Sequence, residues 1–271
     1  MTLILDGTKA SAAIADTLKK RIRDLAQRPC LAVIQIGDRR ESTTYIARKR
    51  DFGERIGAEV RHLVLPESVT EAEVLARIEE CNRDAAVHGI LLQLPIPHGL
   101  PLQKLLNAIV LAKDVDGLAA GSTFVPATAR GIAELLQFYR IPIRGKKIAM
   151  LGRSALVGAP TARLLSHLGG VVTVCHSETP NTREVTRASE IIVVAIGKPR
   201  QIDATYFTAG AGQTVVDVGI TSQETLVGDV NFEAVKDMVV AISPVPGGVG
   251  PMTVAALFEN LLDAYGRQRV L

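Results

Sequence analysis

Apolar residues along the chain follow two different periods. Spacings of three and four residues predict amphipathic helices, and short runs rich in β-branched residues predict strands covered on both faces. The helices are expected at residues 7–27, 41–56, 71–85, 101–112, 131–139, 158–168 and 254–265. The strands are expected at residues 30–37, 60–65, 89–95, 148–151, 171–177, 190–197, 213–220 and 238–242.

The alternation of these elements predicts an α/β protein with parallel sheets. A connector rich in Ala, Gly and Ser at residues 118–128 divides two such blocks near residue 130. We predict an N-terminal three-layer α/β domain, residues 1–129 plus the returning last helix at 252–271. The C-terminal domain, residues 130–251, is predicted to be a Rossmann-like parallel sheet, with a cleft between the domains. Sites in such sheets gather at the carboxyl ends of strands.

A glycine-containing turn joins the strand at 148–151 to the helix that begins at Gly158. This layout can place a phosphate on free backbone N–H groups at the positive end of a helix dipole. Gly152 and Gly158 stand six residues apart, and Ser154 occupies the position of the second glycine in the usual dinucleotide fingerprint. An ordinary strand-to-helix turn fits this stretch alone equally well.

The next strand ends in Cys175-His176-Ser177, where a Rossmann-like fold meets the adenosine ribose. An acid at this point selects NAD, whereas a 2′-phosphate requires hydrogen-bond donors. No carboxylate precedes Glu178, and Arg153 stands in the glycine turn close by. A guanidinium and a hydroxyl suit a phosphate dianion, so NADP is favoured over NAD. The alternative is that Arg153 is a solvated cation and Ser177 a helix cap.

The composition excludes several classes of protein. The net charge is only +3, aromatic residues make up 4% of the chain and Trp is absent, so we expect no nucleic-acid partner. No apolar run approaches the ~20 residues that span a bilayer, and the first residues lack the pattern of a signal peptide. We therefore expect no membrane partner. Three isolated cysteines without metal-ligand spacing indicate a reducing cytoplasm and no metal site.

Polar residues in the first block stand where apolar ones are expected. Ser42, Tyr45 and Lys49 share one face of a predicted helix. Gln93 interrupts an apolar strand, where an unbonded amide would cost roughly 1–3 kcal/mol. Asp116 stands beside Gly117, at the exit of a predicted element. If the ends of the elements that carry Lys49, Gln93 and Asp116 converge, these three residues line one cleft. The alternative is an amphipathic rim whose ammonium group reaches water.

Six motifs in one order carry a resemblance over nearly the whole chain. Together they are similar to the bifunctional methylenetetrahydrofolate dehydrogenase/methenyltetrahydrofolate cyclohydrolase family. The ten-residue string ending at Thr253 is the most specific of them. The motifs are Ser42-x-x-Tyr45-x-x-x-Lys49, Gly89-Ile-Leu-Leu-Gln-Leu-Pro-Ile-Pro97, Lys113-Asp-Val-Asp-Gly117, Gly152-Arg-Ser-x-x-Val-Gly158, Cys175-His-Ser177 and Pro244-Val-Pro-Gly-Gly-Val-Gly-Pro-Met-Thr253.

The resemblance implies NADP-dependent oxidation of methylenetetrahydrofolate and hydrolysis of the methenyl product to formyltetrahydrofolate. It also implies a cytoplasmic homodimer that acts on tetrahydrofolate one-carbon derivatives, with a link to purine biosynthesis. Catalysis would depend on Lys49, Gln93, Asp116 and Tyr45. Substrate contacts are expected from Tyr45, Lys49, Leu92, Gln93, Leu94, Asp116, Pro246, Gly247, Gly248, Val249 and Gly250, and NADP contacts from Gly152, Arg153, Ser154, Val157, Gly158, His176, Ser177 and Ile220.

The two reactions make different chemical demands. Hydride transfer to a nicotinamide depends mainly on positioning, whereas hydrolysis must move a proton. A lysine with a pKa near 10.4 is a poor proton shuttle at pH 7, but burial beside a cationic intermediate can lower that pKa by roughly 3 pH units. Lys49 is therefore predicted to carry the proton. The resemblance implies that Gln93 tunes this lysine, that Asp116 holds the pterin amino edge and that Tyr45 flanks the ring.

The chain departs from the family pattern before the second block. Ala127 and Ala129 replace the Cys and the second Pro of the family's Pro-Cys-Thr-Pro-x-Gly motif, and the connector from Gly117 to Pro126 is shorter than usual. Because of the shortened connector, a cyclohydrolase alone and a non-catalytic protein that binds NADP or folate remain as alternatives. A third alternative is a shikimate-dehydrogenase-like oxidoreductase of another substrate, but the folate-side motifs argue against it.

Overall fold

A computed structural model describes residues 2–222 and 226–268 of the chain. The chain forms two compact units, each built around its own parallel sheet. The three-stranded unit comprises residues 12–127 and 254–271, and the six-stranded unit comprises residues 1–11 and 128–253. The predicted α/β fold with parallel sheets is confirmed. None of the helices formed by the described residues is long and apolar enough to cross a membrane.

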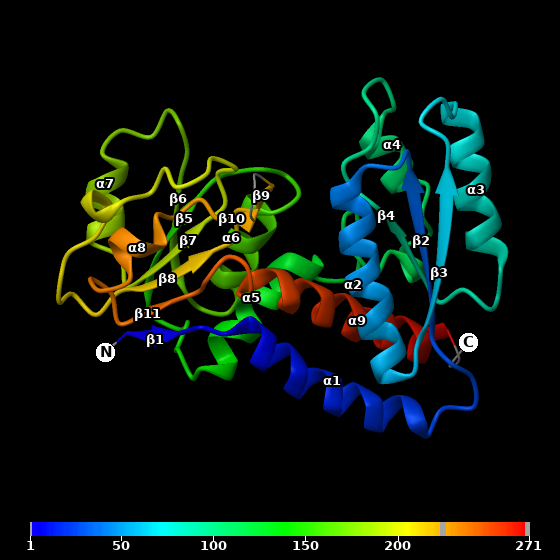
Figure 1. The fold of residues 1–271 in the computed structure, drawn as a ribbon, viewed down its shortest axis with the longest axis horizontal. Helices are drawn as coiled ribbons and strands as arrows, with labels where there is room; N and C mark the ends of the chain where they lie inside the picture. The colour runs from blue at the N-terminus through cyan, green and yellow to red at the C-terminus, as the bar shows by residue number, and fades with distance from the viewer. Residues whose placement is uncertain (1, 223–225, 269–271) are drawn as a thin grey trace. The chain divides into compact units, whose positions relative to one another are not determined.

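In the three-stranded unit, β2 (Cys30–Ile36) lies between β3 (Glu59–Leu65) and β4 (Gly89–Leu92), and both pairings are parallel. Every residue of β2 is buried, as expected for a nearly continuous apolar run, interrupted only by Gln35, that is covered on both faces. The sheet is accompanied by α2 (Arg40–Ile56), α3 (Glu71–Arg83), α4 (Leu102–Asn107) and the short helix η1 (Leu111–Lys113), several of which are labelled in Figure 1.

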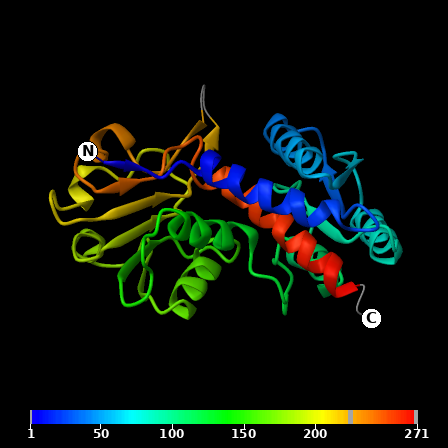
Figure 2. The same cartoon turned by 90° about the horizontal axis from the view of Figure 1, so that it is seen from below.

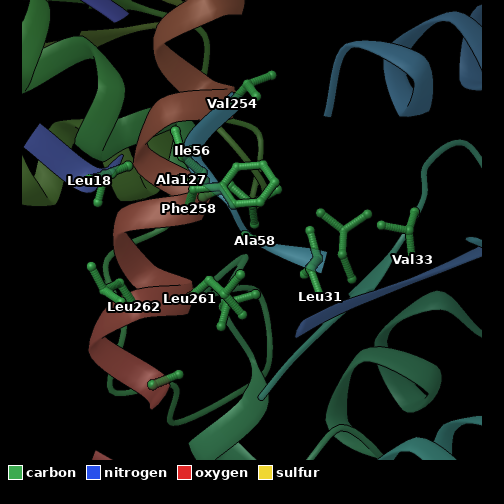
Figure 3. Close-up of a cluster of buried hydrophobic side chains, with 14 of the residues drawn as sticks. Leu18, Leu31, Val33, Ile56, Ala58, Ala127, Val254, Phe258, Leu261 and Leu262 are labelled. Atoms are coloured by element: carbon green, nitrogen blue, oxygen red, sulfur yellow. The ribbon is translucent and has the colours of Figure 1, made fainter. Parts of the chain in front are cut away.

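Two long helices complete the core of this unit. Most of α1 (Gly7–Arg23) and most of α9 (Val249–Gln268) belong to it, and they run side by side in Figure 2. Phe258 of α9 packs against Phe52 of α2 with ring centroids 5.2 Å apart. Figure 3 shows how Leu18 and Leu31 join Phe258 in one apolar cluster. This cluster packs α1, α2 and α9 together against the face of the sheet that carries Leu31 and Val33.

The six-stranded unit has the strand order β1-β11-β8-β7-β5-β6, and its strand pairs are all parallel. Helices, a short helix and a small hairpin accompany this sheet. The strands are β1 (Leu3–Ile4), β5 (Lys147–Leu151), β6 (Val171–Cys175), β7 (Ile191–Val194), β8 (Thr214–Asp217) and β11 (Ala241–Ile242). The other elements are α5 (Ala127–Phe138), α6 (Gly158–His167), α7 (Thr182–Arg187), η2 (Ala204–Tyr206), β9 (Thr221–Ser222), β10 (Leu226–Val227) and α8 (Phe232–Val235).

Several boundaries differ from the prediction, and three of the differences lie near the predicted site residues or the division into units. Strand β1 was not predicted; it pairs with β11 and places residues 1–11 in the six-stranded unit, whereas the sequence assigned them to the N-terminal domain. Helix α9 begins at Val249, five residues before the predicted start at Val254. Strand β4 ends at Leu92, so Gln93 lies just beyond it. Polar or ligand-binding side chains commonly stand at this carboxyl end of a parallel strand.

Candidate active site

A buried lysine and an amide form the centre of the candidate site in the three-stranded unit. Lys49 Nζ donates a hydrogen bond to Oε1 of Gln93 over 2.7 Å. The Gln93 amide nitrogen donates to the carbonyl of Leu94 (2.7 Å), which fixes the carboxamide with its oxygen toward the amine. Lys49 is 8% exposed, so the alternative of an ammonium group that reaches bulk water is wrong for this side chain.

The charge of Lys49 is destabilised by its surroundings. Burial lowers the pKa of Lys49 to about 8, and the negative charge of Asp116 acts in the opposite direction. Burial raises the pKa of Asp116 to about 6, against the effect of Lys49 and with that of Asp114. Because burial outweighs the mutual attraction in both groups, each titrates closer to neutrality than it does in water.

Tyr45 lies one helical turn before Lys49 on α2. Its hydroxyl is buried and has no hydrogen-bond partner among the described residues. Burial raises the pKa of Tyr45, so the phenol stays protonated. The guanidinium of Arg48 lies 5.5 Å from the centre of the ring. A buried hydroxyl without a partner costs stability, and a polar group of a ligand would offset that cost.

The loop from Lys113 to Gly117 carries two side chains with structural contacts and one candidate functional side chain. Lys113 donates to the carbonyls of Cys81, Asn82 and Asp84 at the end of α3 (3.0, 2.8 and 2.8 Å). Asp114 accepts hydrogen bonds from backbone N–H groups of the connector, at Leu118 (3.3 Å) and Ala119 (3.0 Å). Asp116 is half-buried and remains available to a ligand.

The short connector is tied to its own unit. Asn260 of α9 donates to the carbonyls of Val115 (2.8 Å) and Val125 (2.9 Å), at the two ends of the segment. Arg267 covers the ring of Phe124 at 4.5 Å from its centre. Ala127 and Ala129 are both fully buried, so the departures from the family motif are accommodated as small apolar residues.

The glycine turn in the six-stranded unit requires its two glycines. Gly152 has a φ of +112°, and a Cβ there would lie 2.1 Å from the carbonyl oxygen of Ala195. A Cβ on Gly158 would lie 2.3 Å from the carbonyl oxygen of Gly152. Ser154 Oγ accepts hydrogen bonds from the N–H groups of Val157 (3.3 Å) and Gly158 (3.2 Å). The turn is therefore closely packed, and its exposed backbone can approach a phosphate.

The tip of β6 does not match either sequence interpretation fully. Arg153 is exposed, but its guanidinium lies 3.1 Å from Oε2 of Glu178 and is not merely solvated. Ser177 is exposed and is not a helix cap, because α7 begins at Thr182 after Asn181. His176 is half-buried, and Cys175 ends the strand as a buried thiol.

The Pro-Gly-Gly loop that precedes α9 also belongs to the six-stranded unit. Gly247 has a φ of +103°, and its carbonyl accepts a hydrogen bond from the N–H of Thr8 (3.1 Å). A Cβ on Gly248 would lie 2.5 Å from the carbonyl oxygen of Pro244. A Cβ on Gly250 would lie 3.7 Å from the partly exposed side chain of Ile220, so two of the predicted ligand-binding residues are neighbours.

Two buried carboxylates were missed by the sequence analysis. Asp217 accepts hydrogen bonds from the N–H groups of Gly219, Asp229 and Val230 (3.1, 3.0 and 2.9 Å). Asp229 accepts from three consecutive N–H groups at the end of β7, those of residues 196–198 (2.7, 2.9 and 2.7 Å). Burial raises the pKa of Asp217 to about 7. In the sequence, Asp217 follows a run of apolar residues, as Gln93 does. A polar residue in such a run is the sequence signal by which Asp217 can be identified.

Each of these acids also packs on a glycine beside the other. A Cβ on Gly228 would lie 1.9 Å from Oδ2 of Asp217, and a Cβ on Gly219 would lie 2.1 Å from the Asp229 carboxyl carbon. The pair fixes the chain at the carboxyl ends of the neighbouring strands β7 and β8, immediately before Ile220. It therefore positions backbone at the edge of the sheet where cofactors bind.

Together these features define a class: a two-domain α/β enzyme with a nucleotide-binding parallel sheet in one unit and a buried lysine in the other. Comparison with known proteins gives the family. Residues 5–116 match the domain described as "Tetrahydrofolate dehydrogenase/cyclohydrolase, catalytic domain". Residues 126–269 match "Tetrahydrofolate dehydrogenase/cyclohydrolase, NAD(P)-binding domain".

Individual relatives are similar to this chain over nearly its full length. The chain is 41% identical to the Bifunctional protein FolD of Agathobacter rectalis, with 98% of this chain and 100% of that protein covered. The crystal structure of the FolD methylenetetrahydrofolate dehydrogenase/cyclohydrolase from Campylobacter jejuni has a TM-score of 0.94 at 38% identity, covering 98% and 99% of the two chains. The Trypanosoma brucei enzyme, crystallised with NADP cofactor and an inhibitor, has a TM-score of 0.91 at 32% identity, covering 98% of each chain.

The chain belongs to the tetrahydrofolate dehydrogenase/cyclohydrolase family. The family resemblance expected from the six motifs is confirmed. The alternative of a shikimate-dehydrogenase-like oxidoreductase is not retained. The two domain models of the tetrahydrofolate dehydrogenase/cyclohydrolase family together match residues 5–269 of this chain, apart from the connector at 117–125.

Proposed function

We propose that this chain is a bifunctional, NADP-dependent methylenetetrahydrofolate dehydrogenase and methenyltetrahydrofolate cyclohydrolase of one-carbon folate metabolism. The single observation that carries the proposal is the buried hydrogen bond of Lys49 to Gln93, with the pKa of the lysine lowered to about 8. A lysine in this state is able to accept a proton near neutral pH, which the hydrolytic reaction needs.

The residues expected to contact folate are proposed as substrate ligands. Tyr45 offers its unpartnered hydroxyl, and Asp116 offers a carboxylate to the amino edge of the pterin. Leu92 and Leu94 flank Gln93 at the end of β4; Leu94 is half-buried and can offer an apolar contact to the ring, whereas the Leu92 side chain is fully buried, so a contact from Leu92 would come from its backbone. The segment Pro246–Gly250 carries the closely packed glycines and is assigned to close against the substrate.

NADP is assigned to the six-stranded unit, and the residues present fit it. A side chain fits at neither Gly152 nor Gly158, and the turn between them presents backbone where a phosphate can approach. Val157, His176, Ser177 and Ile220 complete the assigned set around this edge. NADP, when bound, accepts the hydride from the one-carbon bridge of the substrate.

In the hydrolytic reaction, water adds to the carbon of the methenyl bridge, and the added water loses a proton. The neutral amine of Lys49 accepts this proton and can return it to the ring nitrogen that leaves as the formyl product forms. The amide of Gln93 holds the amine in place because its oxygen accepts from Nζ. The hydride transfer needs no base, so its rate depends mainly on how the substrate and the nicotinamide are positioned.

Two assays on one variant test the catalytic assignment. Lys49→Met should abolish the decay of methenyltetrahydrofolate and leave part of the NADPH formation from methylenetetrahydrofolate. Lys104→Met is the control, since Lys104 is an exposed lysine paired with Glu71. Unchanged hydrolysis in Lys49→Met would remove this residue from the mechanism. Wild-type protein that binds both ligands and turns over neither would contradict the proposed activity.

The choice of cofactor has its own test. Arg153→Ala should weaken the binding of NADP more than that of NAD, because only NADP carries the 2′-phosphate that the guanidinium is assigned to bind. An equal loss for the two dinucleotides, measured by titration of the purified protein, would remove Arg153 from the phosphate site.

We also propose a homodimer in the cytoplasm, with a role in supplying formyl groups for purine biosynthesis. Strand β6 lies at one edge of its sheet, and Val171 (60% exposed) and Val174 (38% exposed) leave apolar surface there. An uncovered edge strand of this kind favours pairing with another chain. The three cysteines are free and buried, which fits a reducing compartment. Light scattering gives the molar mass of wild type and of Val171→Lys in solution. The wild type should be a dimer and the variant a monomer; a variant that is still a dimer would exclude the β6 edge as the interface.

A further inference from the structure

Glu178 lies at the carboxyl edge of the six-stranded sheet, three residues beyond the end of β6. One of its carboxylate oxygens is 3.1 Å from a guanidinium nitrogen of Arg153 and 3.6 Å from Nδ1 of His176. Both of those residues are assigned to the cofactor, whereas Glu178 is not. An anionic side chain thus lies against the cation that is assigned to receive an anionic phosphate.

The backbone around Glu178 is held firmly, but its side chain is not. The N–H of His176 donates to Oγ1 of Thr179 (2.9 Å), and the N–H of Thr179 donates to the carbonyl of His176 (2.9 Å). The side chains of Arg153 and Glu178 are 58% and 74% exposed. Ion pairs this exposed are weak, so the carboxylate can rotate away from Arg153 without unfolding the turn.

We propose that Glu178 is a specificity-determining residue, which occupies the 2′-phosphate place in the free protein and reduces the preference for NADP over NAD. The inference rests on the proposed function, since it concerns the same cofactor site. A phosphate must displace the carboxylate from Arg153, and the displaced carboxylate remains nearby as a like charge. NAD carries a neutral hydroxyl at this position, so it meets neither effect.

The experiment measures the dissociation constants of NADP and NAD for the full chain and for Glu178→Gln. The substitution should tighten NADP binding about fivefold, the upper range for release of one exposed ion pair, and leave NAD binding unchanged. Glu184→Gln is the matched control, because Glu184 is an exposed acid of α7 and its replacement changes the net charge equally. This control should alter neither constant.

A second comparison tests whether the effect passes through Arg153. In the Arg153→Ala background, Glu178→Gln should tighten NADP binding less than it does in the wild type, since the cation that Glu178 covers is gone. An equal gain in both backgrounds would make Glu178 a general surface charge and overturn the assignment.

The remaining outcomes are distinguishable. Unchanged NADP binding in Glu178→Gln, with both dinucleotides still bound, overturns this inference alone and leaves the proposed function intact. Weaker NAD binding in the variant would assign the carboxylate to the ribose hydroxyls and also overturn it. Wild-type protein that binds neither dinucleotide would contradict the proposed function and this inference together.

Discussion

The lowered pKa of Lys49 makes the hydrolytic reaction depend on pH in a measurable way. With a pKa of about 8, about 10% of the amine is neutral at pH 7, against about 0.04% for an ordinary lysine. The neutral fraction then rises to about 90% at pH 9. Because the neutral amine is the form that accepts the proton, the rate of hydrolysis should rise about tenfold from pH 7 to pH 9 and then level off.

An ordinary lysine gives a different curve. With a pKa near 10.4 its neutral fraction rises nearly 100-fold over the same interval, about tenfold per pH unit, without levelling off. The shape of the profile therefore distinguishes a buried lysine from an exposed one. The burial of Lys49 is the physical origin of the difference, and the charge of Asp116 only reduces it.

The assay follows the decay of methenyltetrahydrofolate absorbance at constant ionic strength, with the rate of the enzyme-free reaction subtracted at each pH. Lys104→Met should keep the wild-type profile, and Lys49→Met should lose the enzymatic rate across the whole range. A flat wild-type profile between pH 7 and pH 9, or a rise that continues without a plateau, would refute the assignment of the proton transfer to Lys49.

Three further predictions concern charges around the two sites. Asp116→Asn should move the midpoint of the hydrolysis profile below that of the wild type, because the carboxylate raises the pKa of Lys49; an unmoved midpoint in the same assay would exclude this coupling. Asp217→Asn should lower the free energy of unfolding in urea by about 2 kcal/mol, since at least one backbone N–H loses its acceptor, and wild-type stability would contradict its role. Lys113→Met should lower the free energy of unfolding by about 3 kcal/mol by leaving three carbonyls at the C-terminal end of α3 without their donor. Lys104→Met is the comparison expected to be neutral, and equal unfolding midpoints for the two variants would contradict this role of Lys113.

The parts of the fold that the sequence predicts are those with long apolar patterns. Strand β2 is a continuous run of seven buried residues, which supplies its own signal. Strand β1 contains only Leu3 and Ile4, both exposed, and it forms because β11 lies beside it. No period can be read from two residues. The first turn of α9 is hidden in the sequence by the glycines and proline at residues 247–251.

The candidate site divides in the same way. Gln93 was identified because a polar residue inside an apolar strand needs a partner, but its partner Lys49 is 44 residues away in the chain. The resemblance to a known family supplied that connection before the structure did. Glu178 shows the limit of local reasoning: its side chain contacts Arg153 across 25 residues, and no local sequence pattern links the two.

The reciprocal packing of Asp217 and Asp229 on Gly228 and Gly219 restricts how this chain can change during evolution. A side chain at either glycine would displace a carboxylate that several backbone N–H groups require. A larger residue at one position therefore becomes acceptable only if the acid across from it is replaced at nearly the same time. These four sites should be inherited as a block, and libraries that vary them one by one should return few folded proteins.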